Sequence, residues 1–86
     1  AVDYTASLST TWTGSAAPYT QNVTVTGLSA TAKIFVGLAD NATDAEYAAA
    51  AVAQLMCTAK KADQITITAR GTKPEIALPI IVRVVG

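Results

Sequence analysis

The sequence has no histidine and a single cysteine among its 86 residues. General acid–base catalysis near neutral pH relies most often on histidine, and zinc sites are built mainly from histidine and cysteine. Because Cys57 has no partner, an internal disulfide is impossible, which excludes the scaffold of small disulfide-rich secreted domains. We therefore expect no enzyme activity, no metal and no cofactor.

Charge is also scarce, at 14% of residues, and six basic side chains balance six acidic ones. Without net positive charge, the chain has no field to hold a phosphate backbone, and Lys60 and Lys61 form too small a patch to supply one. The longest strongly apolar runs, 48–53 and 78–82, are far shorter than the roughly 20 residues of a membrane helix. We expect neither nucleic-acid binding nor membrane insertion.

The acidic side chains cluster only at Asp40, Asp44 and Glu46. Two carboxylates in a cleft could hydrolyse a glycosidic bond, and oxygen ligands could hold a hard cation. A turn followed by a helix start explains the same residues, because acidic side chains are favoured at helix N-termini. We therefore assign them to structure.

The first half of the chain alternates between apolar and polar residues, which is the period of a strand with one wet face. The alternation covers 4–13, 22–27 and 33–38, with turn residues at 14–18 between the first two runs. We expect the first two runs to form a hairpin or neighbouring strands. In the third run Phe35 falls on the opposite face from Ile34 and Val36.

The period then changes to that of a helix. Thr43 and Glu46 have the spacing of a capping box, in which each side chain satisfies a backbone N–H at the helix start. An alanine-rich helix is expected over 44–55, packed on the sheet. The residues expected to face the sheet are Tyr47, Ala48, Ala51, Val52 and Leu55.

Three more strands are expected after the helix, at 55–59, 64–70 and 76–85. The last is apolar on both faces, which indicates burial on both. Pro79 lacks an N–H and therefore favours an edge or a bulge. An apolar edge strand suggests a subunit interface, for which the candidate residues are Ile76, Leu78, Ile80, Ile81, Val82 and Val84.

These elements predict one α+β domain spanning 1–86. About six mostly antiparallel strands would form a sandwich-like body, with the helix inserted between strands 3 and 4. A pure β-sandwich is the alternative if the helix is shorter. A chain of this length buries a limited share of its surface, so oligomerisation would add stability.

Trp12 and Tyr19 are amphipathic aromatic side chains that could stack on a sugar ring if they were exposed near a loop. Because the chain has so few aromatic residues, we expect Trp12 to pack in the core rather than to bind a glycan. Exposure of either ring would favour a carbohydrate-binding adhesin module.

Several segments in order resemble a module found at the C-terminal ends of fibre proteins in phages of Gram-positive bacteria. They are the run 12–21 from Trp12 to Gln21, the strand 23–28, Phe35 to Ala39, the alanine-rich helix, 57–59 and the terminal run 73–80. The resemblance implies a non-enzymatic virion structural protein and the tip of a longer tail or head fibre. It also implies a homotrimer and possible contact with a host cell-surface glycan. It supplies no contact residues for this chain.

Overall fold

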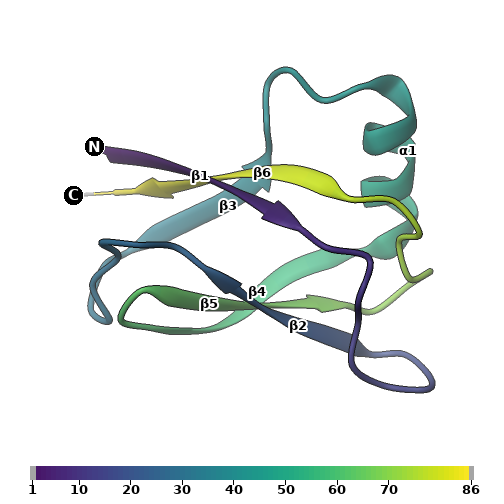
Figure 1. The fold of residues 1–86 in the computed structure, drawn as a ribbon, viewed down its shortest axis with the longest axis horizontal. Helices are drawn as coiled ribbons and strands as arrows, with labels where there is room; N and C mark the ends of the chain where they lie inside the picture. Colours follow the sequence, from purple (N-terminus) through teal and green to yellow (C-terminus); the bar gives the residue numbers. More distant parts are fainter. Residues whose placement is uncertain (1, 86) are drawn as a thin grey trace.

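In the computed structural model, which describes residues 2–85, the chain forms two antiparallel three-stranded sheets and one helix (Figure 1). The strand order is β1-β6-β3 in the first sheet and β2-β5-β4 in the second. The helix lies between β3 and β4 in sequence, so the predicted α+β fold is confirmed. The elements are β1 (Val2–Leu8), β2 (Tyr19–Thr24), β3 (Ile34–Leu38), α1 (Asp44–Ala53), β4 (Leu55–Lys61), β5 (Gln64–Ala69) and β6 (Leu78–Val84).

The core lies between the two sheets and follows from the alternation of side chains along each strand. In the first sheet, Leu8 pairs with Leu78 and both are fully buried. In the second sheet, Ile65 and Ile67 of β5 face them. The buried apolar core comprises Leu8, Trp12, Val23, Val25, Leu28, Ala53, Ile65, Ile67, Ala69, Leu78, Ile80 and Val82.

The first two strands are not paired with each other, so the predicted hairpin is wrong. β1 pairs with β6, whereas β2 pairs with β5 in the other sheet. The intervening loop crosses from one sheet to the other and closes on itself where Thr13 and Thr20 exchange backbone hydrogen bonds of 2.8 and 3.1 Å. Alternation indicates which face of a strand is buried but carries no information about its neighbour, which explains the error.

The predicted edge position of the last strand is also wrong, because β6 is the central strand of its sheet. Pro79 is tolerated there because its missing N–H falls just beyond the end of β3. Its carbonyl still accepts a 2.9 Å hydrogen bond from the N–H of Ala39, which follows β3. A proline at the end of a ladder removes no bond that a neighbouring strand requires.

The helix begins as the capping box predicts. The N–H of Glu46 donates to Thr43 Oγ1 (3.2 Å), and the N–H of Thr43 donates to the Glu46 carboxylate (2.7 Å). The helix ends at Ala53, earlier than predicted, because Gln54 adopts a left-handed conformation with φ of 53°. Such a residue at the C-terminus stops a helix and releases its last carbonyls.

Those carbonyls are bound by the segment that follows β5. The N–H groups of Gly71 and Thr72 donate to the carbonyls of Ala53 and Val52, over 2.9 and 3.0 Å. A side chain at Gly71 would collide with the carbonyl oxygen of Val52, so this close approach requires glycine. The helix is therefore anchored by main-chain atoms at one end of the sandwich (Figure 1).

The predicted buried face of the helix is wrong except at Leu55, which is half-buried against the core but begins β4. Tyr47, Ala48, Ala51 and Val52 are exposed, whereas Ala53 is buried and Ala49 and Ala50 are half-buried against the core. Alanine is small enough to lie on either face, so the apolar spacing did not define the contact. The main-chain anchor sets the rotation of the helix instead.

Candidate functional site

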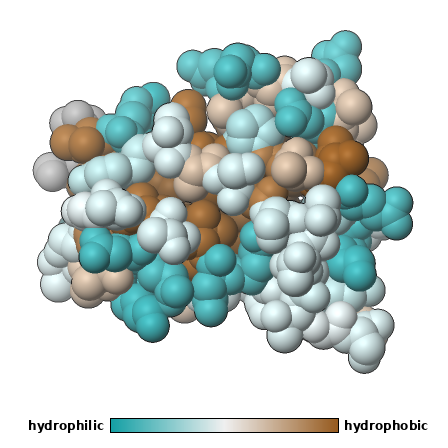
Figure 2. All heavy atoms as spheres, in the orientation of Figure 1, coloured by the Kyte–Doolittle hydropathy of each residue, from teal (hydrophilic) through white to brown (hydrophobic). Residues whose placement is uncertain are grey.

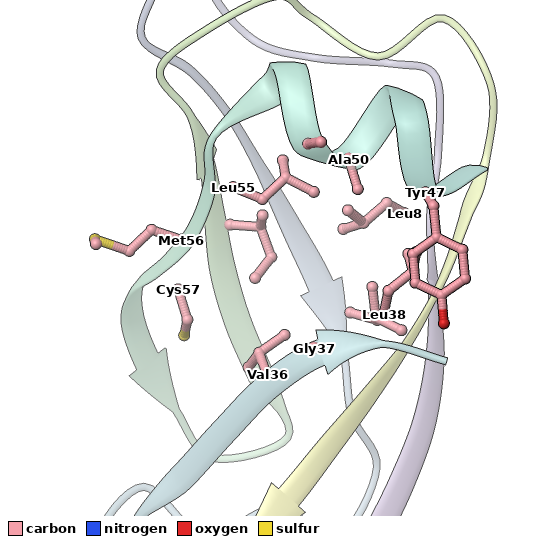
Figure 3. Close-up of a pocket in the computed structure, with 12 residues that line it drawn as sticks. Leu8, Val36, Gly37, Leu38, Tyr47, Ala50, Leu55, Met56 and Cys57 are labelled. Atoms are coloured by element: carbon pink, nitrogen blue, oxygen red, sulfur yellow. The ribbon is translucent and has the colours of Figure 1, made fainter. Parts of the chain in front are cut away.

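An apolar cavity of about 340 Å³ lies between the sheets, beside the edge strands β3 and β4 and under α1. Figure 3 shows Leu8, Leu38 and Leu55 directed into this space, whereas Met56 points away from it. A volume of this size lies at the lower end of the range for small-molecule sites. The lining residues are Leu8, Val36, Gly37, Leu38, Tyr47, Ala50, Ala51, Leu55, Met56, Cys57, Ile67 and Ile80.

The inner end and the mouth of the cavity differ in exposure. Leu8, Ile67 and Ile80 belong to the buried core, whereas Tyr47 and Met56 at the mouth are 49% and 56% exposed. On the face that carries the other two edge strands, β1 and β2, apolar atoms also form a broken band between the two layers, with hydrophilic residues above and below it (Figure 2). The gap between the sheets is thus lined by apolar side chains that are only partly covered.

Cys57 is the one thiol in the chain, and it lines this cavity. Burial raises the pKa of the Cys57 thiol, an effect that outweighs the opposite influences of the Ala59 backbone and of the nearby charge of Lys60. A protonated thiol is a poor nucleophile. The cavity therefore offers mainly apolar contact.

The outer face of the first sheet carries a second hollow, of about 250 Å³. Phe35 on β3 is 72% exposed, the largest exposure among the large apolar side chains described. Two residues further along the same strand, a side chain at Gly37 would meet no atom within 4 Å. Ile81 on the neighbouring strand lies opposite Gly37, and Asp40 and Arg83 border the hollow.

The structure divides the predicted interface residues into two groups. Leu78, Ile80 and Val82 are buried in the core of the same chain, so their assignment to a subunit interface is wrong. The second sheet covers them, which explains why a strand apolar on both faces needs no partner on its inner face. The remaining candidates are Ile81 and Val84, which are half-buried, and Ile76, which is exposed in the loop before β6.

The two candidate glycan contacts are not exposed platforms. Trp12 is 8% exposed and belongs to the core, which confirms the expected packing and contradicts the weaker assignment as a glycan contact. Tyr19 is half-buried, and the ammonium of Lys73 lies 5.4 Å from the centre of its ring. The side chain of Gln21 fixes the loop before Trp12 through hydrogen bonds of 3.0 Å to both the N–H and the carbonyl of Ser9. Hydrogen bonds to Gln21 therefore fix the loop before Trp12, and Lys73 lies beside the ring of Tyr19.

The acidic residues do not form a shared centre. Glu46 is engaged in the capping box, Asp44 opens the helix, and Asp40 borders the outer hollow. Within residues 2–85, no group of three or more histidine, cysteine or acidic residues is arranged to hold a metal ion. No helix in the same range has both the length and the apolar character needed to cross a bilayer.

Sequence reasoning placed Phe35 on the opposite face from its neighbours, which the structure confirms, but gave it no role. The relation between Phe35 and Gly37 was already visible as two outward positions of one strand. The cavity left no signal in the sequence, because its walls come from elements distant along the chain.

The comparisons with family models, curated proteins and solved structures find no match to this chain. Function is therefore inferred from the sequence resemblance and from the residues that the structure brings together. Those residues are mainly apolar and gather along β3.

Proposed function

We propose that this chain is a non-enzymatic structural module of a phage virion, the self-associating tip domain of a tail or head fibre. The exposure of Phe35 on a regular strand carries this proposal. An aromatic side chain of this size, exposed beside other apolar groups, marks a surface that gains stability when it is covered.

The segment that bears this surface is one of those on which the resemblance rests. The segment from Phe35 to Ala39 contains the exposed ring of Phe35 and the glycine at the outer hollow, and it covers most of the edge strand β3. The resemblance and the exposed surface thus coincide in β3. This agreement supports a role for the strand in contacts between chains.

The two outer faces of the sandwich differ in a way that favours contact through the first sheet. On the outer side of the second sheet the hydroxyls are already paired, since Thr66 donates to Asn22 and the hydroxyls of Thr58 and the buried Thr68 are hydrogen-bonded to each other. Met56 is an exposed apolar side chain on this face, but it is less exposed than Phe35. The first sheet presents Phe35 and Ile81. Polar groups that are already satisfied gain little from a partner, whereas exposed apolar groups gain from being covered.

The self-association proposed here retains Ile81 of the expected homotrimer interface and otherwise uses different residues, because most of the β6 candidates are core residues. It is also preferred over the carbohydrate-binding alternative. That alternative requires an exposed aromatic platform at Trp12 or Tyr19, and one ring is buried while the other is half-buried beside Lys73.

The first test is the solution mass, measured by light scattering coupled to size exclusion across a concentration series. We expect a mass above that of one chain, reduced toward one chain in Phe35→Ser. Val52→Ser is the matched control, because it removes an exposed apolar side chain on α1, away from β3. A mass of one chain at every concentration would contradict self-association.

The virion assignment needs a separate test. Antibodies raised against the domain should label the distal ends of fibres on particles of the phage that encodes the chain, as seen by immunogold electron microscopy. Label confined to lysed host cells, with none on purified particles, would contradict a place in the virion.

A further inference from the structure

We infer that two copies of this chain pair the edges of their β3 strands in antiparallel fashion, about a twofold axis at Val36. In this arrangement Phe35 of each copy covers Gly37 of the other. The inference rests on the proposed self-association and specifies the contact that produces it. It does not depend on where the chain is located.

Along one edge of β3, the backbone groups have no partner strand within the described residues. The N–H of Ala39 donates to Pro79 (2.9 Å), and the N–H of Val85 donates to the carbonyl of Lys33 (2.7 Å). Residues 33 and 39 therefore direct their backbone groups toward β6, and by alternation so do 35 and 37. The N–H and C=O groups of residues 34, 36 and 38 point to the other side, where no strand of the described chain pairs with β3.

One register between two copies of β3 would satisfy these backbone groups. A twofold axis at Val36 sets Val36 opposite its own copy and Ile34 opposite Leu38 of the other chain. Each residue of β3 whose N–H and C=O point away from β6 then lies opposite another such residue. This is the condition for hydrogen-bonded pairs in an antiparallel ladder, and it joins the two first sheets into one continuous sheet.

Phe35 and Gly37 lie between those hydrogen-bonded pairs. The same register sets Phe35 opposite Gly37 of the other copy, in a non-hydrogen-bonded pair whose Cα atoms lie about 4.5 Å apart. Gly37 does not adopt the left-handed conformation that would require glycine, and its outer side is open. An aromatic ring across from a strand glycine covers the exposed backbone. The twofold axis produces this pair twice.

Charges at the ends of β3 favour the same arrangement. Lys33 and Asp40 are both exposed and lie just before and just after the strand. Antiparallel pairing about Val36 brings Lys33 of each copy beside Asp40 of the other. These exposed pairs favour the register more than they add affinity, since salt screens them.

The edge of β3 lacks the features by which proteins usually prevent strand pairing. On the edge strand β4 of the second sheet, a bulge between Cys57 and Ala59 interrupts the ladder, and Lys60 and Lys61 follow. Within Ile34–Leu38 there is no charge, no proline and no register shift. Bulges and lysines are the common protection of exposed edges, so their presence on β4 and absence from β3 distinguish the two.

The test uses single-cysteine chains in a Cys57→Ala background, one carrying Phe35→Cys and the other Gly37→Cys. In a mixed pair, cysteine 35 of one chain lies opposite cysteine 37 of the other, while the second Phe35–Gly37 contact stays intact. Each variant alone sets cysteine opposite glycine or phenylalanine. Each is therefore the matched control for the mixture under the same mild oxidation.

We expect the mixture to yield a covalent dimer several-fold above either variant alone, with the 35–37 linkage identified by peptide mass spectrometry. The unoxidised parent should have the mass of two chains, measured at the same concentration. A mass above one chain with equal or no cross-linking in the mixture would overturn the β3 pairing and leave self-association standing. A mass of three chains would likewise overturn the pairing, and a mass of one chain without cross-linking would overturn both.

Discussion

The guanidinium of Arg83 is hydrogen-bonded to both carboxylate oxygens of Asp3, over 2.8 and 3.2 Å, although the two residues are 80 positions apart in the chain. They lie opposite each other in the register of β1 and β6. The contact therefore links the two ends of the chain on the outer face of the first sheet. Both side chains are about half exposed, so salt reduces its strength.

This ion pair should make stability depend on pH in the acid range. The hydrogen bond from Arg83, followed by its charge, lowers the pKa of Asp3 below its ordinary value of 3.8. A lowered folded-state pKa stabilises the fold above the ordinary value, and this contribution is lost as the pH falls through the folded pKa. Asp3→Asn should therefore unfold more readily than the parent at pH 7, and the difference should vanish at strongly acid pH. Chemical unfolding of both proteins across pH 2–7 tests this, and a difference that persists unchanged at the acid end would contradict it.

The close approach at Gly71 should make this position intolerant of any side chain. Gly71→Ala sets a methyl group against the carbonyl of Val52, and we expect a loss of about 1–3 kcal/mol in the free energy of unfolding. Gly37→Ala, compared at low protein concentration where the chains are separate, is the matched control, because the added methyl group meets no atom of its own chain within 4 Å. It should be neutral or add up to about 1 kcal/mol, since glycine weakens a strand interior. Equal losses in the two variants, measured by urea unfolding, would argue against the anchor.

The capping box should contribute measurably to the start of α1. Thr43→Ala removes the acceptor for the Glu46 N–H and should reduce the free energy of unfolding by about 1 kcal/mol. Thr43→Ser keeps a hydroxyl at the same place and should lose much less. Urea unfolding followed by circular dichroism compares them, and the prediction fails if serine and alanine are equally destabilising.

Substitutions at two residues of β6 should distinguish a core position of the single chain from a position on its outer face. Leu78→Ala creates a cavity in the core and should cost about 2–5 kcal/mol in the free energy of unfolding. Ile81 lies half-buried on the outer face, so Ile81→Ala should cost only about 1 kcal/mol by lost burial. Unfolding measured at low concentration tests this order. A larger loss in Ile81→Ala than in Leu78→Ala would contradict the place of Leu78 in the core.

The sequence allowed the elements themselves to be predicted because their signals are local. Alternation gave the strands, and the Thr43–Glu46 spacing gave the helix start. The pairing of strands was not predictable in this way, since β1 and β2 have similar patterns but lie in different sheets. Likewise, an apolar run with a proline suggested an edge, whereas Pro79 lies in a central strand at a point where its missing N–H breaks no bond.

The candidate site was less predictable than the fold. The buried face of α1 depends on hydrogen bonds from Gly71 and Thr72, which lie about twenty residues beyond the carbonyls they bind. The cavity depends on how far apart two sheet edges lie, which no local pattern encodes. By contrast, alternation alone places Phe35 and Gly37 on one face of their strand. The structure adds that β3 is an edge strand, and this is what allows the pair to contact a second copy.

The main-chain anchor of α1 also affects how the exposed surface of this helix can change in evolution. It consists of N–H and C=O groups, which are the same for almost every amino acid, and it depends on few side chains of the helix itself. Outward positions such as Tyr47 and Val52 can then be exchanged without loosening the helix. The exposed surface of α1 can therefore vary widely among related sequences, while the same main-chain hydrogen bonds hold the helix in place.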